Sequence, residues 1–365
     1  MPPGSCCGAE PPSVFSIRCR GHATTAVRST PRRRGTAVAL LGWPIEGRLG
    51  VTALHGGTTN GTLDAALDWL IQAHDNTGNG AFPPHYPVIP TLYLAAWHLE
   101  RPELAQRAAR AAQRAVELQL SSGAVWGGVV GTGRALLGWL SAFAETGSGV
   151  FAGAARRAGR FLFATLDHEG VWRRDGAHSP HTAWALAETG RRLGAPELRA
   201  AAAKHLRTVA RLQHDDGWMP DVRFPERSRG LADLADAIRG LLEGGRLLRD
   251  ERLIALAARS AAGIAAAQTR EGRLPDRFAA GWQAAESSCC SVGQAHMANV
   301  WLRLYEITGA RVWLEPVRPV LRALTSAPRR TGAITATKFL VDALIREERT
   351  ARSSVGETTA ALVLA

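Results

Sequence analysis

Hydrophobic and polar positions along the chain form two kinds of helical segment. In one kind, Ala and Leu recur every three or four residues while Arg and Glu occupy the other side, which is typical of a helix with one buried face. The other kind is apolar on nearly every side, as expected of a helix enclosed by other helices. The sequence lacks stretches that alternate between apolar and polar residues, the pattern of half-buried strands. We therefore expect an all-α chain.

The two kinds of segment alternate along the chain and pair into about six helical hairpins. The amphipathic segments predict outer helices at Leu63–Ala73, Arg101–Leu118, Val150–Leu166, Pro196–Leu212, Glu251–Ala267 and Arg311–Leu324. The apolar segments predict inner helices at Val88–Leu99, Gly131–Glu145, His181–Leu193, Leu231–Leu248, Ser288–Thr308 and Thr337–Glu347. Because the series starts with an outer helix and ends with an inner one, the first and last helices can pair and close a ring. The period alone also allows an open helical solenoid.

A short turn recurs after the outer helices, about every 50 residues. In its clearest copy, Gln213-His-Asp-Asp-Gly-Trp218, a helix ends in Gln and is followed by a polar turn, a glycine and an aromatic residue. Gly123, Gly170 and Gly217 supply the left-handed residue that ends a helix, and we expect the aromatic residue to pack between neighbouring repeats. The repeat predicts an (α/α)6 toroid whose site lies where the inner helices begin.

Charge and hydropathy exclude some classes of partner. The chain has 365 residues and a formal net charge of +12, but much of the excess comes from arginines between Arg18 and Arg34. We expect residues 1–45 to form a basic disordered tail, residues 46–350 the toroid and residues 351–365 a disordered C-terminal tail. Elsewhere Arg is interspersed with Ala and Glu on helix faces, which does not predict a nucleic-acid partner. No apolar run reaches the roughly 20 residues that span a bilayer, so no membrane span is expected.

The five cysteines do not form a disulfide framework. Cys289 and Cys290 are adjacent, and the other three lie in the basic N-terminal segment. A reducing, cytoplasmic location therefore fits better than export, although Arg32–Arg34 and the apolar run behind them faintly resemble an export signal. Adjacent cysteines lack the usual spacing of zinc ligands, so neither a metal nor another cofactor is expected. The sequence does not indicate an oligomeric state.

Two resemblances rest on these residues. The turn Gln213–Trp218 resembles the glutamine–tryptophan repeat of terpenoid cyclases, and similar turns occur in six-hairpin glycosidases and polysaccharide lyases. A longer similarity, to bacterial six-hairpin proteins described as squalene-cyclase-like or as polysaccharide-biosynthesis proteins, is carried by Leu63–Trp69, Ile89–Thr91, Ile238–Glu243, Cys290–Gln294, Val300–Gly309 and Lys338–Leu344. This resemblance implies an α/α toroid and a role in polysaccharide metabolism.

The loops before the inner helices and the starts of these helices carry the candidate site residues. Proton-handling groups suited to cleaving or rearranging a saccharide are Asp221, Glu286, His178 and Asp236. Flat aromatic side chains and bidentate cations suited to an acidic sugar are Trp126, Trp172, Trp218, Trp282, Tyr86, Arg173 and Arg223. The structural alternatives are packing of each tryptophan in a seam between hairpins, helix capping by Asp236 and a solvated His178.

These residues predict a carbohydrate-active protein that acts on, or binds, an acidic saccharide in polysaccharide metabolism, as a hydrolase, a lyase or an epimerase. A glycan-binding or scaffold toroid without catalysis is the first alternative. A terpenoid-cyclase-like enzyme is the second, although the D-x-D-D arrangement expected of an acid that protonates an alkene is absent from the sequence.

Overall fold

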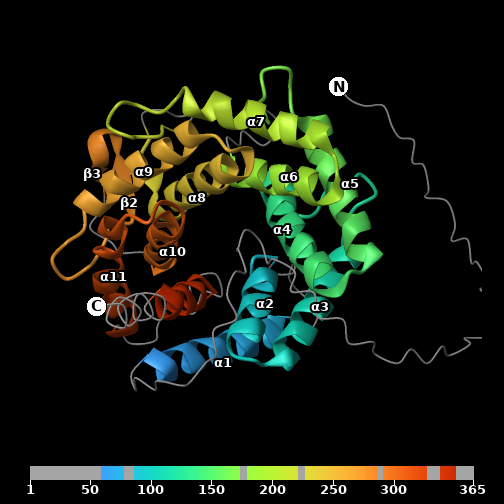
Figure 1. The fold of residues 1–365 in the computed structure, drawn as a ribbon, viewed down its shortest axis with the longest axis horizontal. Helices are drawn as coiled ribbons and strands as arrows, with labels where there is room; N and C mark the ends of the chain where they lie inside the picture. Colours follow the sequence, from blue (N-terminus) through green and yellow to red (C-terminus); the bar gives the residue numbers. More distant parts are fainter. Residues whose placement is uncertain are drawn as a thin grey trace, which may run out of the picture. The chain divides into compact units, whose positions relative to one another are not determined.

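A computed structural model of the chain describes residues 59–77, 86–172, 179–220, 227–285, 291–326 and 338–350. All of them belong to one unit of the chain, Val38–Ala365. The expected all-α toroid is confirmed, because the described residues are mostly helical and their helices form an inner and an outer layer around a ring (Figure 1). The five cysteines lie outside the described residues.

The helices alternate between the two layers along the chain. The outer layer contains α1 (Thr59–Thr77), α3 (Pro102–Glu117), α5 (Gly149–Thr165), α7 (Pro196–Ala210), α9 (Glu251–Ala266) and α11 (Val317–Ser326). The inner layer contains α2 (Val88–His98), α4 (Gly128–Thr146), α6 (Pro180–Leu193), α8 (Leu231–Leu248), α10 (Ser291–Thr308) and a last helix at residues 338–350. Each helix predicted from the sequence overlaps one of these.

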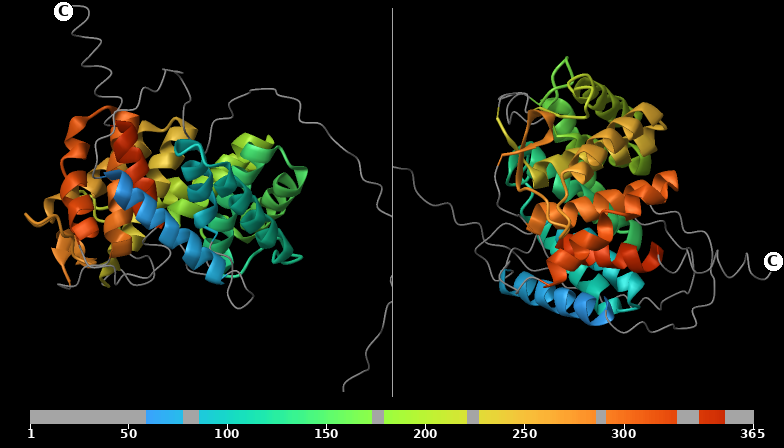
Figure 2. Two further views of the ribbon diagram at one scale, coloured as in Figure 1. Left: turned by 90° about the horizontal axis from the view of Figure 1, so that it is seen from below. Right: turned by 90° about the vertical axis from the view of Figure 1, so that its left-hand side faces the viewer.

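Contacts between successive inner helices close the ring. Helix α4 lies between α2 and α6, and α8 lies between α6 and α10. The last helix connects the two ends of this series: Asn299 of α10 donates its side-chain N–H to the Phe339 carbonyl at 2.7 Å, and His98 of α2 lies 3.0 Å from the Glu348 carboxylate. Both views of Figure 2 show α1 beside this last helix. The first outer helix and the last inner helix therefore meet, as the sequence predicts.

The recurrent turn ties each repeat to the next outer helix. The side-chain amide of Gln213 donates to the Leu256 carbonyl at 2.9 Å and to the Ser260 hydroxyl at 2.7 Å, both on α9. Gln119 reaches the Ala154 carbonyl of α5 in the same way, at 3.0 Å. Gly217 has φ +86°, and a Cβ there would lie 2.9 Å from the backbone of Arg259. Only glycine permits both that conformation and that close approach.

Buried tryptophans join the inner layer to the outer one. Trp139 of α4 and Trp301 of α10 are fully buried. Each indole N–H donates at 3.2 Å to a carbonyl of the outer helix that precedes it in the chain, that of Ala112 or Ala261. The large side chain fills the space between layers while its polar atom stays hydrogen-bonded, as burial requires.

Two local features differ from the prediction. The outer helix expected at Arg311–Leu324 is divided into a short 3-10 helix, Arg311–Leu314, and α11, because Pro316 has no N–H to donate and disfavours helical backbone before it. The residues just before α8 also pair with the segment between α9 and α10 in a small antiparallel sheet. Its strands β1 (Arg229–Gly230), β2 (Arg277–Ala279) and β3 (Gln283–Ala284) are too short for the alternation that marks a strand in a sequence.

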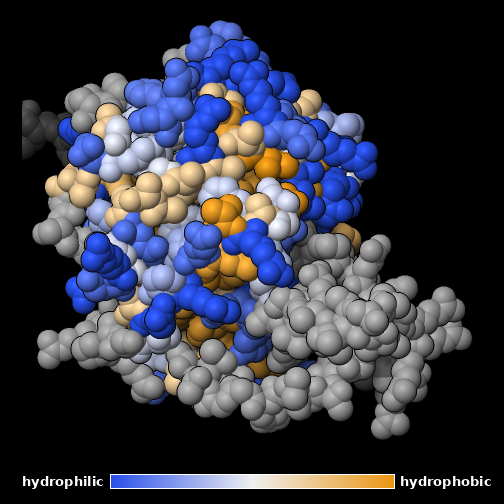
Figure 3. All heavy atoms as spheres, turned by 60° about the vertical axis from the view of Figure 1, so that its left-hand side comes forward, coloured by the Kyte–Doolittle hydropathy of each residue, from blue (hydrophilic) through white to orange (hydrophobic). Residues whose placement is uncertain are grey.

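The face shown in Figure 3 is mostly hydrophilic, and apolar side chains reach its surface in small areas between charged ones. This distribution matches an outer helix such as α9, whose solvent side carries Glu251, Arg252 and Arg259. None of the helices in the described part of the chain is long and apolar enough to cross a membrane.

Candidate functional site

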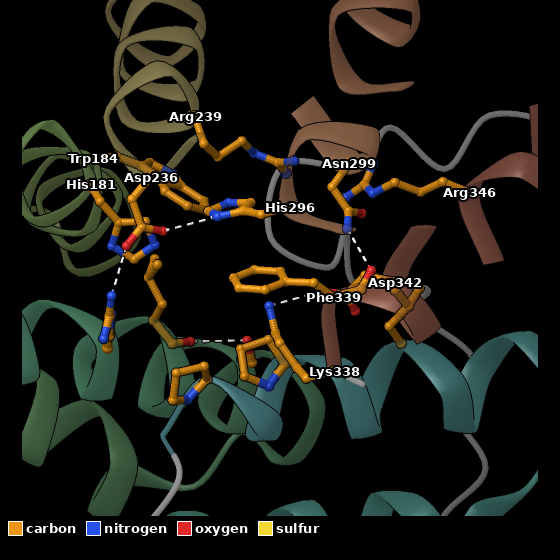
Figure 4. A pocket seen from close by; sticks show the side chains of 16 residues that line it. His181, Trp184, Asp236, Arg239, His296, Asn299, Lys338, Phe339, Asp342 and Arg346 are labelled. Carbon is orange, nitrogen blue, oxygen red and sulfur yellow. Dashed lines mark hydrogen bonds and ion pairs between the residues drawn. The ribbon is translucent and has the colours of Figure 1, made fainter. Parts of the chain in front are cut away.

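The inner helices enclose a cavity of about 130 Å³, shown in Figure 4. Its wall is built from residues that recur at positions i, i+3 and i+7, such as Arg134, Leu137 and Ser141 on α4. These positions lie above one another on one face of a helix, so the cavity is lined in successive levels. The described residues that line it are Pro87, Pro90, Leu94, Arg134, Leu137, Ser141, His181, Trp184, Asp236, Arg239, His296, Asn299, Lys338, Phe339, Asp342 and Arg346.

Asp236 is the carboxylate at the first level. Its Oδ2 accepts a hydrogen bond from Arg134 Nη2 at 2.7 Å, and its Oδ1 lies 3.4 Å from His296 Nδ1. Burial acts to raise the pKa of Asp236, but His181, His296 and Arg134 outweigh it and hold the pKa well below its usual range. Asp236 is therefore ionised at neutral pH.

Two buried imidazoles flank this carboxylate. Burial lowers the pKa of His181 to about 4 and that of His296 to about 3, against the opposing effect of Asp236. Both rings are consequently uncharged at neutral pH. His181 meets Trp184 edge-on, with ring centroids 5.1 Å apart, and His296 stacks on Phe339 at 3.9 Å. These aromatic contacts set the orientation of both rings.

Arg239 and Asn299 form the second level, on α8 and α10 respectively. The Arg239 guanidinium lies over the Trp184 ring at 5.6 Å, and its Nη2 contacts Glu243 at 2.7 Å. Its Nε is buried and has no hydrogen-bond partner. The Asn299 amide N–H groups donate to the carbonyls of Ala295 and Phe339, so the amide is oriented and its Oδ1, also buried and without a partner, remains as an acceptor.

The third level is a buried network of ion pairs. Glu243 is fully buried and accepts from Arg303 at 2.8 and 3.2 Å, in addition to Arg239 and Arg246. Glu306 accepts from Arg303 and from Arg346, each at 2.7 Å. Although burial opposes ionisation, these arginines hold the pKa of Glu243 and of Glu306 well below the usual range. The network therefore remains charged and holds Arg239 and Arg346 in place.

The cavity favours anions. Among the described lining side chains, four are cationic, Arg134, Arg239, Lys338 and Arg346, and two are carboxylates, Asp236 and Asp342. Lys338 pairs with Asp342 at 2.9 Å and lies over the Phe339 ring. Among the described residues, no group of three or more His, Cys, Asp or Glu side chains could hold a metal ion. The cations and ionisable groups of the described lining are suited to anion binding and proton transfer.

Of the described candidates from the sequence, Asp236 is the one that lines the cavity. Trp172 and Trp218 are buried in the repeat turns, where Trp172 packs against His205 and donates its N–H to the Leu162 carbonyl. Trp282 packs edge-on against Trp218 at 5.4 Å. In these three positions the indoles fill seams between hairpins.

Tyr86 and Trp126 lie at opposite extremes of exposure. Tyr86 is buried in the hydrophobic core next to Pro87, whereas Trp126, just before α4, is 74% exposed. Neither belongs to the lining of the cavity. The remaining candidates lie outside the described residues: Asp221, Glu286, His178, Arg173 and Arg223.

The sequence analysis did not select most of the lining residues. Arg134, Arg239 and Asn299 stand within the inner helices, whereas the sequence candidates came mainly from the loops before them. The sequence did contain a signal for them. Charged or amide side chains at positions i, i+3 and i+7 of an otherwise apolar helix lie on one face of it, and that face is the one expected to line a polar cavity. Arg239 and Glu243, inside the apolar α8, are one example.

No family model matches the chain, and no curated protein matches it. Solved structures do match. An unsaturated glucuronyl hydrolase specific for heparin is 14% identical, with a TM-score of 0.64 over 80% of this chain and 98% of its own.

Two further structures match to the same extent. An unsaturated glucuronyl hydrolase from Bacillus sp. GL1, responsible for the degradation of glycosaminoglycan, is 15% identical, with a TM-score of 0.63 over 80% of this chain and 97% of its own. A polysaccharide lyase is 9% identical, with a TM-score of 0.62 over 81% and 99%. The chain thus has the six-hairpin α/α toroid fold of these enzymes.

Proposed function

We propose that this protein binds an acidic saccharide in the central cavity and acts on it by proton transfer through Asp236. The observation that carries the proposal is the position of Asp236, an ionised carboxylate between Arg134 and two uncharged imidazoles, in a cavity lined by all the inner helices. The toroid fold of glucuronyl hydrolases and a polysaccharide lyase supports the choice of ligand class.

Binding would use the second level of the cavity. The unpartnered Arg239 Nε is a donor for a carboxylate or other acid oxygen, and the unpartnered Asn299 Oδ1 is an acceptor for a sugar hydroxyl. The rings of Trp184 and Phe339 provide flat apolar surfaces of the kind on which pyranose faces stack. A cavity of about 130 Å³ suits a single sugar unit better than a long chain segment.

Glycoside cleavage needs a second proton-handling group, typically about 5–10 Å from the first. Asp342, the other lining carboxylate, is paired with Lys338. Asp221, Glu286 and His178 stay the proposed partners of Asp236, and Arg173 and Arg223 stay proposed ligands for the acid group. A lyase or epimerase would need one of these residues to remove a ring proton beside the carboxylate.

A glycan-binding protein without catalysis is the second candidate. It is favoured by the ion pairs of the two described lining carboxylates, Asp236 with Arg134 and Asp342 with Lys338, which leave neither as a ready proton donor. A terpenoid cyclase is disfavoured, because four cationic side chains around the cavity would destabilise an isoprenoid cation.

The test is a panel of oligosaccharides that end in a uronate, an unsaturated uronate or a neutral sugar. Calorimetry measures binding, a reducing-end assay detects hydrolysis, and ultraviolet absorbance of the unsaturated uronate rises for a lyase and falls for a hydrolase of such ends. Asp236→Asn keeps the shape and removes the charge, and we expect at least a hundred-fold loss of turnover with little loss of binding. Asp64→Asn, on the exposed side of α1, is the matched control.

The outcomes separate the candidates. Turnover that Asp236→Asn abolishes and Asp64→Asn leaves intact supports the enzyme. Binding of acidic glycans without turnover of any of them supports the glycan-binding protein. If acidic and neutral glycans alike fail to bind, the saccharide proposal is wrong.

A further inference from the structure

We propose that Arg134 is a displaceable partner of Asp236: an anionic group of the ligand binds Arg134, and Asp236, released from the ion pair, takes up a proton. The inference rests on the proposed function, since the anionic group is the acid group of the saccharide. It assigns to Arg134 the control of when Asp236 becomes an acid, and so resolves how an ion-paired carboxylate could donate a proton.

The ion pair crosses part of the wall that a ligand would touch. Arg134 is on α4 and Asp236 is on α8, and α6 packs between these two helices. The pair therefore reaches past the first turn of α6, where His181 stands, and Figure 4 shows His181 and Asp236 together on one side of the cavity. A ligand entering the cavity meets Arg134 and Asp236 at the same place.

Arg134 is the most exposed of the four cations in the described lining. Its side chain is 40% exposed, compared with 11% for Arg239, 12% for Lys338 and 6% for Arg346. Because the Arg134 guanidinium reaches solvent, it stays hydrated while it exchanges one carboxylate for another. Arg239, Lys338 and Arg346 are buried in their ion pairs and cannot move as freely.

Loss of Arg134 changes the balance between burial and nearby charges that sets the pKa of Asp236. The charged or titratable groups near it come from each inner helix of this region: Arg134 of α4, His181 of α6, Arg239 of α8, His296 of α10 and Lys338 of the last helix. Of these, Arg134 makes a hydrogen-bonded ion pair with the carboxylate, and the two imidazoles are uncharged at neutral pH. Without Arg134, burial still raises the pKa of Asp236, and His181 and His296 oppose it less at neutral pH, because both imidazoles are uncharged there.

The proton balance of this step is simple. On binding, the Asp236 carboxylate takes one proton from water while Arg134 pairs with the acid group of the ligand. In hydrolysis, Asp236 then passes that proton to the glycosidic oxygen as the bond from this oxygen to the sugar carbon breaks. A water oxygen forms the new bond to that carbon, and its extra proton goes to solvent. When the acidic product leaves, Arg134 returns to the carboxylate of Asp236. A neutral sugar leaves the ion pair intact and causes no proton uptake.

Calorimetry in two buffers with different heats of ionisation measures proton uptake directly and needs no turnover. The ligands are a glucuronic-acid-terminated disaccharide and its glucose-terminated counterpart, at neutral pH. The wild type should take up most of one proton with the acidic ligand and none with the neutral one. Asp236→Asn should bind the acidic ligand without proton uptake.

The key variant is Arg134→Gln, which removes the cation. It should abolish proton uptake and lower the affinity for the acidic ligand about ten-fold or more. Arg134→Lys keeps the charge and should restore part of the uptake. Arg114→Gln is the matched control, because Arg114 also forms an ion pair with a carboxylate, Glu117, but on the exposed side of α3. It should behave as the wild type.

Failure of the role proposed for Arg134 can be distinguished from failure of the proposed function. Tight binding of the acidic ligand without proton uptake overturns the role of Arg134 and leaves the saccharide proposal standing. Uptake that persists in a folded Arg134→Gln protein also overturns it, because the proton would then go elsewhere. If the wild type binds neither ligand, both proposals are wrong.

Discussion

Replacing Glu243 by Gln tests whether the buried ion pairs under the cavity stabilise the toroid. Glu243 is fully buried on α8 and contacts Arg239 at 2.7 Å, Arg303 at 2.8 Å and Arg246 at 3.1 Å. Gln has nearly the same size, so the substitution removes the charge and turns one acceptor into a donor that faces arginine N–H groups. Two of those arginines, Arg239 and Arg303, would stay buried without their carboxylate.

The expected cost follows from that loss. Removing one partner of a buried ion pair typically costs about 3–5 kcal/mol, because the remaining charge is left uncompensated. For domains of 150–250 residues, each kcal/mol lowers Tm by about 2–4 °C, so we expect a decrease of the order of 10 °C. Arg239 would also lose the contact that orients it, so the affinity for acidic ligands should fall.

Thermal unfolding followed by circular dichroism measures the change. Glu103→Gln is the matched control, because Glu103 also pairs with an arginine, Arg101 at 2.7 Å, but in an exposed position on α3. Water screens that pair, so the control should unfold close to the wild type. If Glu243→Gln unfolds within about 1 °C of the control, the ion-pair network does not stabilise the fold and the reasoning from burial is refuted.

Three further predictions concern pH, the repeat turn and ring closure. His181 and His296 have folded pKa values of about 4 and about 3, below the unfolded value of about 6.5, so the unfolded chain binds protons first and stability should fall as the pH drops from about 6.5 to about 3. Urea unfolding should show a flatter dependence of stability on pH when both histidines are replaced by Gln, and an unchanged dependence would contradict this. Gly217→Ala should lower the free energy of unfolding in urea by about 1–3 kcal/mol, because φ is +86° at that position. Gly149→Ala, with no atom within 4 Å of the new Cβ, should leave it nearly unchanged. Equal effects of the two substitutions would contradict the strain argument. Glu348→Ala removes the contact between the last helix and His98 of α2, so amide hydrogen exchange should become faster in residues 338–350 and not in α6. An equal increase in both helices would show that the contact does not act locally at the point of ring closure.

Local sequence determined the helices and the way repeats connect. Helical periodicity and the Gln–Gly turn depend on residues a few positions apart, so they can be read without a structure. Gln213 and Gly217 illustrate this, since the same few residues end one helix and bind the next outer helix. The division of the expected outer helix at Pro316 was also present in the sequence, in the residue type itself.

The composition of the site was decided by tertiary structure. Asp236 was predicted as a candidate, but its ion pair joins it to Arg134, which stands 102 positions away in the chain. Trp172 and Trp218 have the chemistry of sugar platforms, yet their turns place them in seams between hairpins. Which side of an apolar helix faces the centre of the ring depends on how all the inner helices pack and close, and that packing consists of contacts between distant segments. For that reason the repeat predicted the ring, while only the closed ring brought Arg134, Asp236 and Arg239 around one cavity.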